Sequence, residues 1–201
     1  MMVVLALLSL VLGVVYGLSG ANWSLLTTLS NHTDLILYAL MFFVGISIGM
    51  HGGLLRKFKE YHIKIFIIPF GIIVGSIIGG IVCALLCGYS AASGAMIASG
   101  LGWYSLSGVT ISNLAGAQMG SIAFLSNLMR EMVSFILIPP ISRHLNDYTC
   151  IAPAAATSED TTLAMMMRYT NEESVMLSVF NGVICSAAVP LLISLFSSFI
   201  A

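Results

Sequence analysis

Long apolar segments alternate with short polar ones along the chain, and five of the apolar segments are long enough to cross a membrane. A membrane-spanning helix needs about 20 mostly apolar residues. This pattern predicts an all-α, polytopic integral membrane protein, with residues 1–201 forming a single transmembrane transporter domain. The predicted spans are residues 1–18, 35–55, 65–89, 122–141 and 174–200.

Two further segments, residues 91–118 and 148–170, are apolar at their ends but rich in Gly, Ser, Thr and Pro at their centres. Irregular backbone at membrane depth is tolerated only where protein buries it or water lines it. A pair of such interrupted segments is the best sequence pointer to the substrate site of a transporter. We therefore expect two discontinuous or re-entrant segments beside about five spans, in a possible inverted repeat.

The positions of Lys and Arg predict the orientation of the chain. Four of its seven Lys and Arg residues lie within residues 56–64, and short loops rich in these residues stay on the cytoplasmic side. The N-terminus is then also cytoplasmic and the C-terminus lies outside, in an inner (plasma) membrane. Residues 91–118 are entered from outside and residues 148–170 from inside. Residues 1–17 lack the positive region of a secretory signal, so we expect a span there.

The composition excludes several classes of function. Hydrophobic residues make up 59% of the chain and charged residues 7%, against about 25% charged in soluble domains. With a net charge of −1 and no basic arm, no nucleic-acid partner is expected. The cysteines show no disulfide or zinc spacing, and three adjacent methionines at 165–167 spread around a helix, so we expect no metal and no cofactor. An intramembrane hydrolase using Ser105 or Ser107 with Asp160 lacks the G-x-S-x-G motif and a suitable histidine, so we expect no enzyme.

Three carboxylates in apolar surroundings are candidates for the transport chemistry: Glu131, Glu159 and Asp160. A charge at the centre of a span costs about 2.5–3.5 kcal/mol on insertion scales, so it persists there when it is paired or functional. Glu159 and Asp160 follow Thr157 and Ser158, which can cap a half-helix. A purely capping role is therefore the alternative for both acids, and it stays open above all for Glu159.

Glu131 shares a helix face with Asn127, four residues earlier. The alternative is that Arg130 and Glu131 lie at the interface and extend to the headgroups. A carboxylate in a half-dry cavity attracts a cation, and because burial favours its neutral form, it can also take up and release a proton. These acids therefore predict exchange of a cation for a proton.

The stretch SGLGWYSLSG, residues 99–108, predicts that a membrane helix is broken there. We expect this break to face the acids named above. Glycine permits unwound backbone, serine supplies hydroxyls beside carbonyls left free for a cation, and an aromatic face favours a cation. The residues expected to form this side of the site are Gly100, Gly102 and Gly108 at the break, with Ser105, Ser107, Trp103 and Tyr104 lining it.

The segments ASGLGWYSLSG, GSIAFLSNLMREMVSFILIPPI and ATSEDTTL occur in this order. They resemble the lysine exporter (LysO-type) family of bacterial inner-membrane proteins over residues 35–201. The resemblance implies export of L-lysine and toxic lysine analogues against a proton, in an antiporter-like fold with discontinuous crossing helices. It also implies that the acids essential in the family correspond to Glu131 and Asp160.

Longer members of that family carry extra helices before the region of resemblance. The resemblance therefore implies a short companion membrane protein that supplies these helices, or a homodimer. Two alternatives to lysine export stay open. One is an exchanger of an inorganic cation such as Na⁺ for protons, and the other is a non-transporting subunit of a split transporter.

Overall fold

The computed structural model divides the chain into two compact units, residues 1–52 and 53–201. Most of the predicted spans 1–18 and 35–55, and nearly all of the basic loop 56–64, lie outside the described residues, so they stay predictions. The structure describes residues 8, 12, 13, 15–20, 23, 24, 28, 32, 39, 42, 46 and 64–200.

In the first unit, residues 15–19 are helical and Tyr16 organises the chain that follows. Its hydroxyl accepts a hydrogen bond of 2.9 Å from the backbone N–H of Trp23. The two rings meet edge to face with their centroids 6.1 Å apart. Tyr16 therefore ties Trp23 to this helix.

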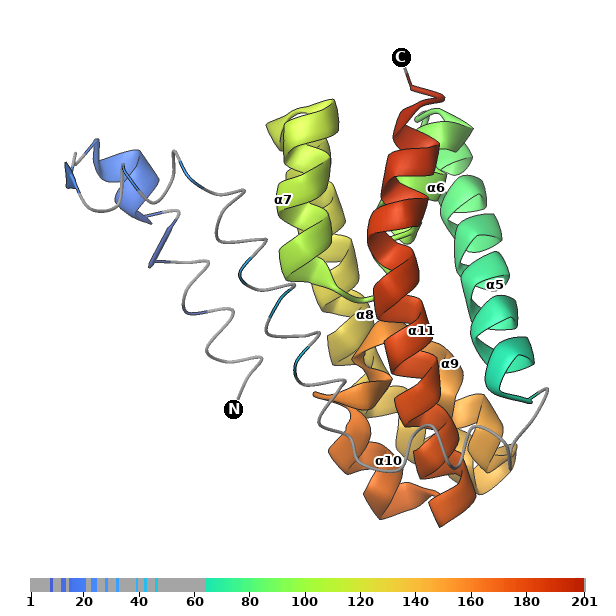
Figure 1. The fold of residues 1–201 in the computed structure, drawn as a ribbon. Helices are drawn as coiled ribbons and strands as arrows, with labels where there is room; N and C mark the ends of the chain where they lie inside the picture. The colour runs from blue at the N-terminus through green and yellow to red at the C-terminus, as the bar shows by residue number, and fades with distance from the viewer. Residues whose placement is uncertain are drawn as a thin grey trace. The chain divides into compact units, whose positions relative to one another are not determined.

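Three helices of the second unit are long and apolar enough to cross a membrane, which confirms three of the predicted spans. They are α5 (Lys64–Leu86), α8 (Ala117–His144) and α11 (Glu172–Ser197). Figure 1 shows them running through the height of the unit. The described residues are helical and contain no strand, as the all-α prediction requires.

Both interrupted segments are broken helices, as predicted. The first consists of α6 (Ala91–Ala98) and α7 (Tyr104–Ala115), separated by a turn. The second consists of η1 (Asp147–Cys150), α9 (Ile151–Ala154), η2 (Ala155–Glu159) and α10 (Leu163–Tyr169). We refer to residues 91–115 as hairpin 1 and to residues 147–169 as hairpin 2, because each turns back at its break (Figure 1).

Contacts with α8 show that hairpin 1 returns to the end from which it started. The carbonyl of Ile97, at the end of α6, lies level with Asn127. Further along hairpin 1, Ser112 of α7 packs against Gly120 of α8. Seven residues of helix separate these two levels, which is about 10 Å at 1.5 Å per residue. The segment is therefore re-entrant and does not cross.

Hairpin 2 behaves in the same way from the opposite end of α8. Arg130 binds the carbonyls of Ala152 and Pro153, whereas Ser142 binds the carbonyl of Tyr169 at 2.6 Å. Arg130 and Ser142 are about 18 Å apart along the helix axis. The two hairpins therefore enter from opposite ends, in keeping with the two discontinuous or re-entrant segments expected from the sequence.

Close packing between α5 and hairpin 1 depends on one pair of glycines. A Cβ atom on Gly80 would lie 2.7 Å from the carbonyl oxygen of Gly94 and would also meet Ala98. Small residues let helices approach closely, and Gly80 brings two backbones together in this way. A Cβ atom on Gly71, Gly75 or Gly79 would meet no described atom within 4 Å.

We predict that Gly80→Ala lowers the midpoint of thermal unfolding in detergent, whereas Gly75→Ala does not. Both changes add the same helix propensity, but only the first forces atoms into an occupied space, at a cost of about 1–3 kcal/mol. Equal midpoints for the two variants would contradict this packing.

Candidate functional site

The tips of the two hairpins touch each other near the middle of the second unit. The backbone N–H of Ala156 donates to the carbonyl of Leu101 over 3.0 Å, and a Cβ atom on Gly102 would lie 3.4 Å from the Thr157 methyl group. Leu101 and Ala155 both have a φ of 49°, and Gly102 has a φ of 97°. Positive φ is uncommon for residues other than glycine, and such backbone gathers at functional sites. The two breaks therefore meet at these residues, whereas the expectation that the acids of the second segment face the first break across one cavity stays a prediction.

Asn127 of α8 holds the tip of hairpin 1 in place. Its Oδ1 accepts a hydrogen bond of 2.8 Å from the N–H of Gly102. Its Nδ2 lies 3.1 Å from the carbonyl of Ile97, 3.3 Å from the hydroxyl of Ser107 and 2.9 Å from the carbonyl of Ala123. Gly100 is needed here because a Cβ atom on it would collide with this amide. Asn127, Ser107, Gly100 and Gly102 thus lie together, and they build the break.

Asn181 of α11 has the corresponding role at hairpin 2. Its Nδ2 donates to the carbonyl of Ala155 at 2.8 Å and lies 3.0 Å from the hydroxyl of Ser158. That hydroxyl lies 2.7 Å from the carbonyl of Ser178. In each half of the unit, the long helix after a break supplies a buried amide to that break. Asn181 was not predicted as a site residue, although it is a single polar side chain in an apolar span, as Glu131 is.

Glu131 lies one helical turn beyond Asn127 and is 1% exposed, which does not fit the alternative of an interfacial position. Neither of its carboxylate oxygens has a hydrogen-bond partner among the described residues. Thr161, whose hydroxyl is also buried without a partner, and Asp160 are its polar neighbours. Asp160 is exposed in the described part of the chain, and its carboxylate accepts a hydrogen bond from the N–H of Thr161.

Glu159 points away from this pair and packs on α11. Its Oε1 accepts a hydrogen bond of 2.9 Å from the hydroxyl of Ser186, and its backbone fills the space beside Gly182. The expected capping of a half-helix by Thr157 or Ser158 is wrong. The chain winds as a tight 3₁₀ turn there, and α10 begins only after Thr162.

The other residues predicted at hairpin 1 separate into two groups. Tyr104 meets Phe124 edge to face, with 5.3 Å between ring centroids, and interacts electrostatically with Glu131 and Asp160. Gly108 gives room to Phe124. Trp103 and Ser105 are half-buried near this point. Their part in substrate binding stays a prediction.

The carbonyls expected to remain free at the break are occupied in this arrangement. Those of Gly100, Leu101 and Gly102 accept backbone hydrogen bonds from Trp103, Ala156 and Tyr104, at 2.7, 3.0 and 3.0 Å. The hydroxyl of Ser99 bonds back to its own helix. The tight turn and the contact with hairpin 2 satisfy these groups, so this face of the break offers no ready set of oxygen ligands.

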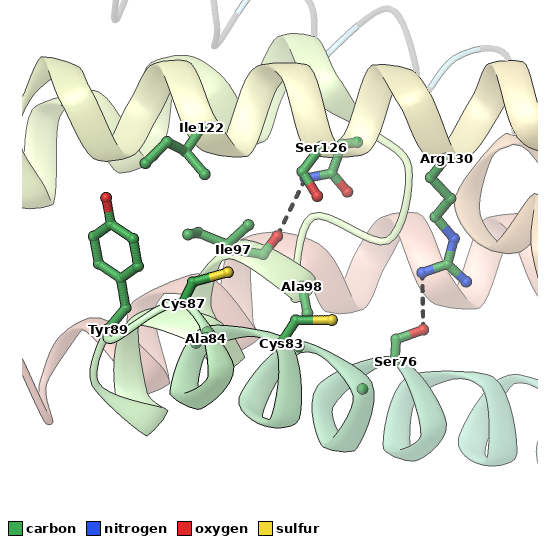
Figure 2. Close-up of a pocket in the computed structure, with 14 residues that line it drawn as sticks. Ser76, Cys83, Ala84, Cys87, Tyr89, Ile97, Ala98, Ile122, Ser126 and Arg130 are labelled. Atoms are coloured by element: carbon green, nitrogen blue, oxygen red, sulfur yellow. Dashed lines mark hydrogen bonds between the residues drawn. The ribbon is translucent and has the colours of Figure 1, made fainter.

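A cavity of about 340 Å³ lies beside the tips, between α5, hairpin 1 and α8. Its wall is mostly apolar and includes Cys83, Cys87 and Ile97, with Asn127 and Arg130 as polar members. Figure 2 shows Arg130 reaching across one end of it to Ser76 of α5. The cavity thus leads from the face of α5 to the α8 side of the hairpin tips.

Comparison with known proteins shows the family of this chain. The family model described as "Lysine exporter LysO" matches residues 7–197. The chain belongs to the lysine exporter LysO family. The lysine exporter LysO of Escherichia coli K12 is 34% identical over 188 residues, which are 94% of this chain and 62% of that protein. The chain thus spans less than two thirds of the length of that relative.

A second relative in the LysO family, a Haemophilus influenzae protein described as a candidate lysine exporter, is 32% identical over 194 residues. These residues are 95% of this chain and 96% of that protein. No solved structure matches the chain. Membership of the LysO family and the three long apolar helices make the chain a membrane protein. The companion protein and the homodimer stay predictions for this LysO-family chain.

Proposed function

We propose that this protein exports L-lysine and similar cationic amino acids across the inner membrane in exchange for protons. The observation that carries the proposal is the Glu131 carboxyl group, buried beside the hairpin tips with Thr161 and Asp160 as its polar neighbours among the described residues. An ionised carboxylate is poorly stabilised in such a place. The proton-bound form therefore belongs to this closed arrangement.

Opening of either hairpin would expose Glu131 to water and let it ionise. The resulting carboxylate can then bind the ammonium group of lysine, which replaces the proton. A proton and a lysine cation thus compete for the Glu131 carboxylate, and the binding of either one stabilises a closed state of the hairpins. The E. coli relative is named a lysine exporter, which supports lysine as the cation.

Asp160 has a different role in this scheme, because its side chain is exposed. It lies close enough to Glu131 for the two carboxyl groups to interact. We propose that Asp160 attracts the substrate cation and that Glu131 exchanges it for a proton. The aromatic ring of Tyr104, which both acids influence, supplies a face for the same cation.

Flux measurements on the purified full chain test this function directly. Proteoliposomes loaded with labelled lysine are diluted into acidic medium without Na⁺, and lysine release and lumenal pH are followed. We expect the external acid to accelerate lysine release and the lumen to acidify as lysine leaves. Proton flux that requires Na⁺ and moves no lysine would show an inorganic-cation exchanger instead. Absence of any flux would contradict transport by this chain alone.

Asp160→Asn is predicted to raise the lysine concentration for half-maximal flux about tenfold and to leave the maximal flux within about threefold. A tenfold change corresponds to about 1.4 kcal/mol, a reasonable loss for one exposed charge acting on a cation. Lysine titrations in the same vesicles measure both quantities. Glu172→Gln is the matched control, because it removes an exposed carboxylate at the start of α11. Equal effects of the two substitutions would argue against a local role for Asp160.

A further inference from the structure

The break in hairpin 2 leaves two carbonyl groups without helical partners. In a continuing α-helix, the carbonyls of Ala152 and Pro153 would accept hydrogen bonds from the N–H groups of residues 156 and 157. The N–H of Ala156 donates instead to Leu101, across the contact between the tips. These carbonyls are partly buried, so they need another donor.

Arg130 supplies that donor with a single side chain. Its Nη2 donates to the carbonyl of Ala152 at 3.0 Å, and its Nε donates to the carbonyl of Pro153 at 3.1 Å. Its Nη1 reaches the hydroxyl of Ser76 on α5 at 2.8 Å, as Figure 2 shows. The guanidinium thus joins α5, α8 and hairpin 2 at the depth of the hairpin tips.

Within residues 64–200, the oxygens that bind this guanidinium are uncharged: two backbone carbonyls and one hydroxyl. Unwound carbonyls of this kind coordinate Na⁺ in transporters built from broken helices. Hard cations also prefer oxygen ligands. Here the positive charge comes from the protein, because an arginine side chain stays protonated.

We infer that Arg130 is a resident cation that takes the place of a coupling metal ion at hairpin 2. The guanidinium holds the tip of hairpin 2 closed against hairpin 1, and the transport cycle needs no Na⁺. Arg130 is thus a positioning residue, and Glu131, the next residue on α8, remains free to exchange its proton for substrate. This inference rests on the proposed function for its consequence in transport, but the binding of a cation at this point can be tested separately.

The cavity beside the tips makes a rescue experiment feasible. Arg130 and Ser76 both line it, so a small cation can reach the oxygens that Arg130→Ala would leave without a donor. We expect Arg130→Ala in Na⁺-free vesicles to lose at least tenfold in lysine flux. Added guanidinium, or Na⁺ at high concentration, should increase the lysine flux of this variant several-fold. Wild-type flux should be the same with and without Na⁺.

Thermal unfolding of the full chain in detergent supplies the second readout. Guanidinium at low millimolar concentration should raise the midpoint of Arg130→Ala and leave that of the wild type unchanged. Arg143→Ala, which removes an exposed guanidinium from the last turn of the same helix, is the control and should keep Na⁺-independent flux and the same midpoint with and without added guanidinium. Three results would each overturn the inference. They are a wild type that requires Na⁺, an Arg130→Ala variant as active as the wild type, and an Arg130→Ala variant that no cation stabilises. If the wild type moves no lysine, the proposed function fails, and the unfolding midpoints alone decide the role of Arg130.

Discussion

Replacing Glu131 with glutamine is expected to abolish the exchange of lysine for protons without loosening the fold. Glutamine has nearly the same shape, but it offers no negative charge to an ammonium group and takes up no proton near neutral pH. Thr161 is the neighbour that can donate to Glu131, and the side-chain oxygen of glutamine can accept from the same hydroxyl. We expect flux driven by a pH gradient to fall at least about 100-fold, which corresponds to about 2.7 kcal/mol.

Two further measurements separate this prediction from a structural effect. The midpoint of thermal unfolding should stay the same or rise, because burial of Glu131 requires it to take up a proton, whereas glutamine is already neutral. In the wild type, acid on the side where lysine binds should raise its half-saturating concentration, because proton and substrate compete. Any residual flux of the variant should not show this dependence. Wild-type flux in Glu131→Gln would remove Glu131 from the mechanism, and an early unfolding transition would point to a structural role.

The spans of this protein could be predicted from the sequence because membrane insertion imposes a length and a polarity on each helix. The expected span at residues 122–141 lies within α8 (Ala117–His144). The two breaks were also predictable, since glycine, proline and hydroxyl residues gather where helices cannot continue. The re-entrant course of each segment was not predictable, because a broken apolar segment has the same composition whether it crosses or turns back.

The candidate site was predictable where a polar residue stands alone against an apolar background. Glu131 and Asn127 were found in this way, because each must be compensated inside the protein. The partner of Arg130 could not be found, because its acceptors are backbone carbonyls more than 20 residues away that become available only when hairpin 2 breaks. Glu159 illustrates the same limit, since its direction depends on the space that Gly182 leaves on α11.

Asn127→Ala is expected to have the other large effect, on the fold as well as on transport. The substitution removes every contact of the amide that holds hairpin 1 and leaves the N–H of Gly102 without its partner in a buried place. Each buried polar group left unsatisfied costs about 1–3 kcal/mol. We expect a clear drop in the midpoint of thermal unfolding and loss of lysine flux. Gln118→Ala, which removes an exposed amide from the same helix, should change neither quantity.

The comparison with Asn181→Ala makes this prediction more specific. If the two hairpins are held in the same way, each by an amide from the following helix, both alanine variants should have a lower midpoint of thermal unfolding than the wild type. Each should also expose its own hairpin to limited proteolysis: residues 91–115 in Asn127→Ala and residues 147–169 in Asn181→Ala. Cleavage at the same place in both variants would mean that the tips form one cooperative element. Unchanged stability of Asn127→Ala would show that the contact between Ala156 and Leu101, rather than the amide, keeps hairpin 1 closed.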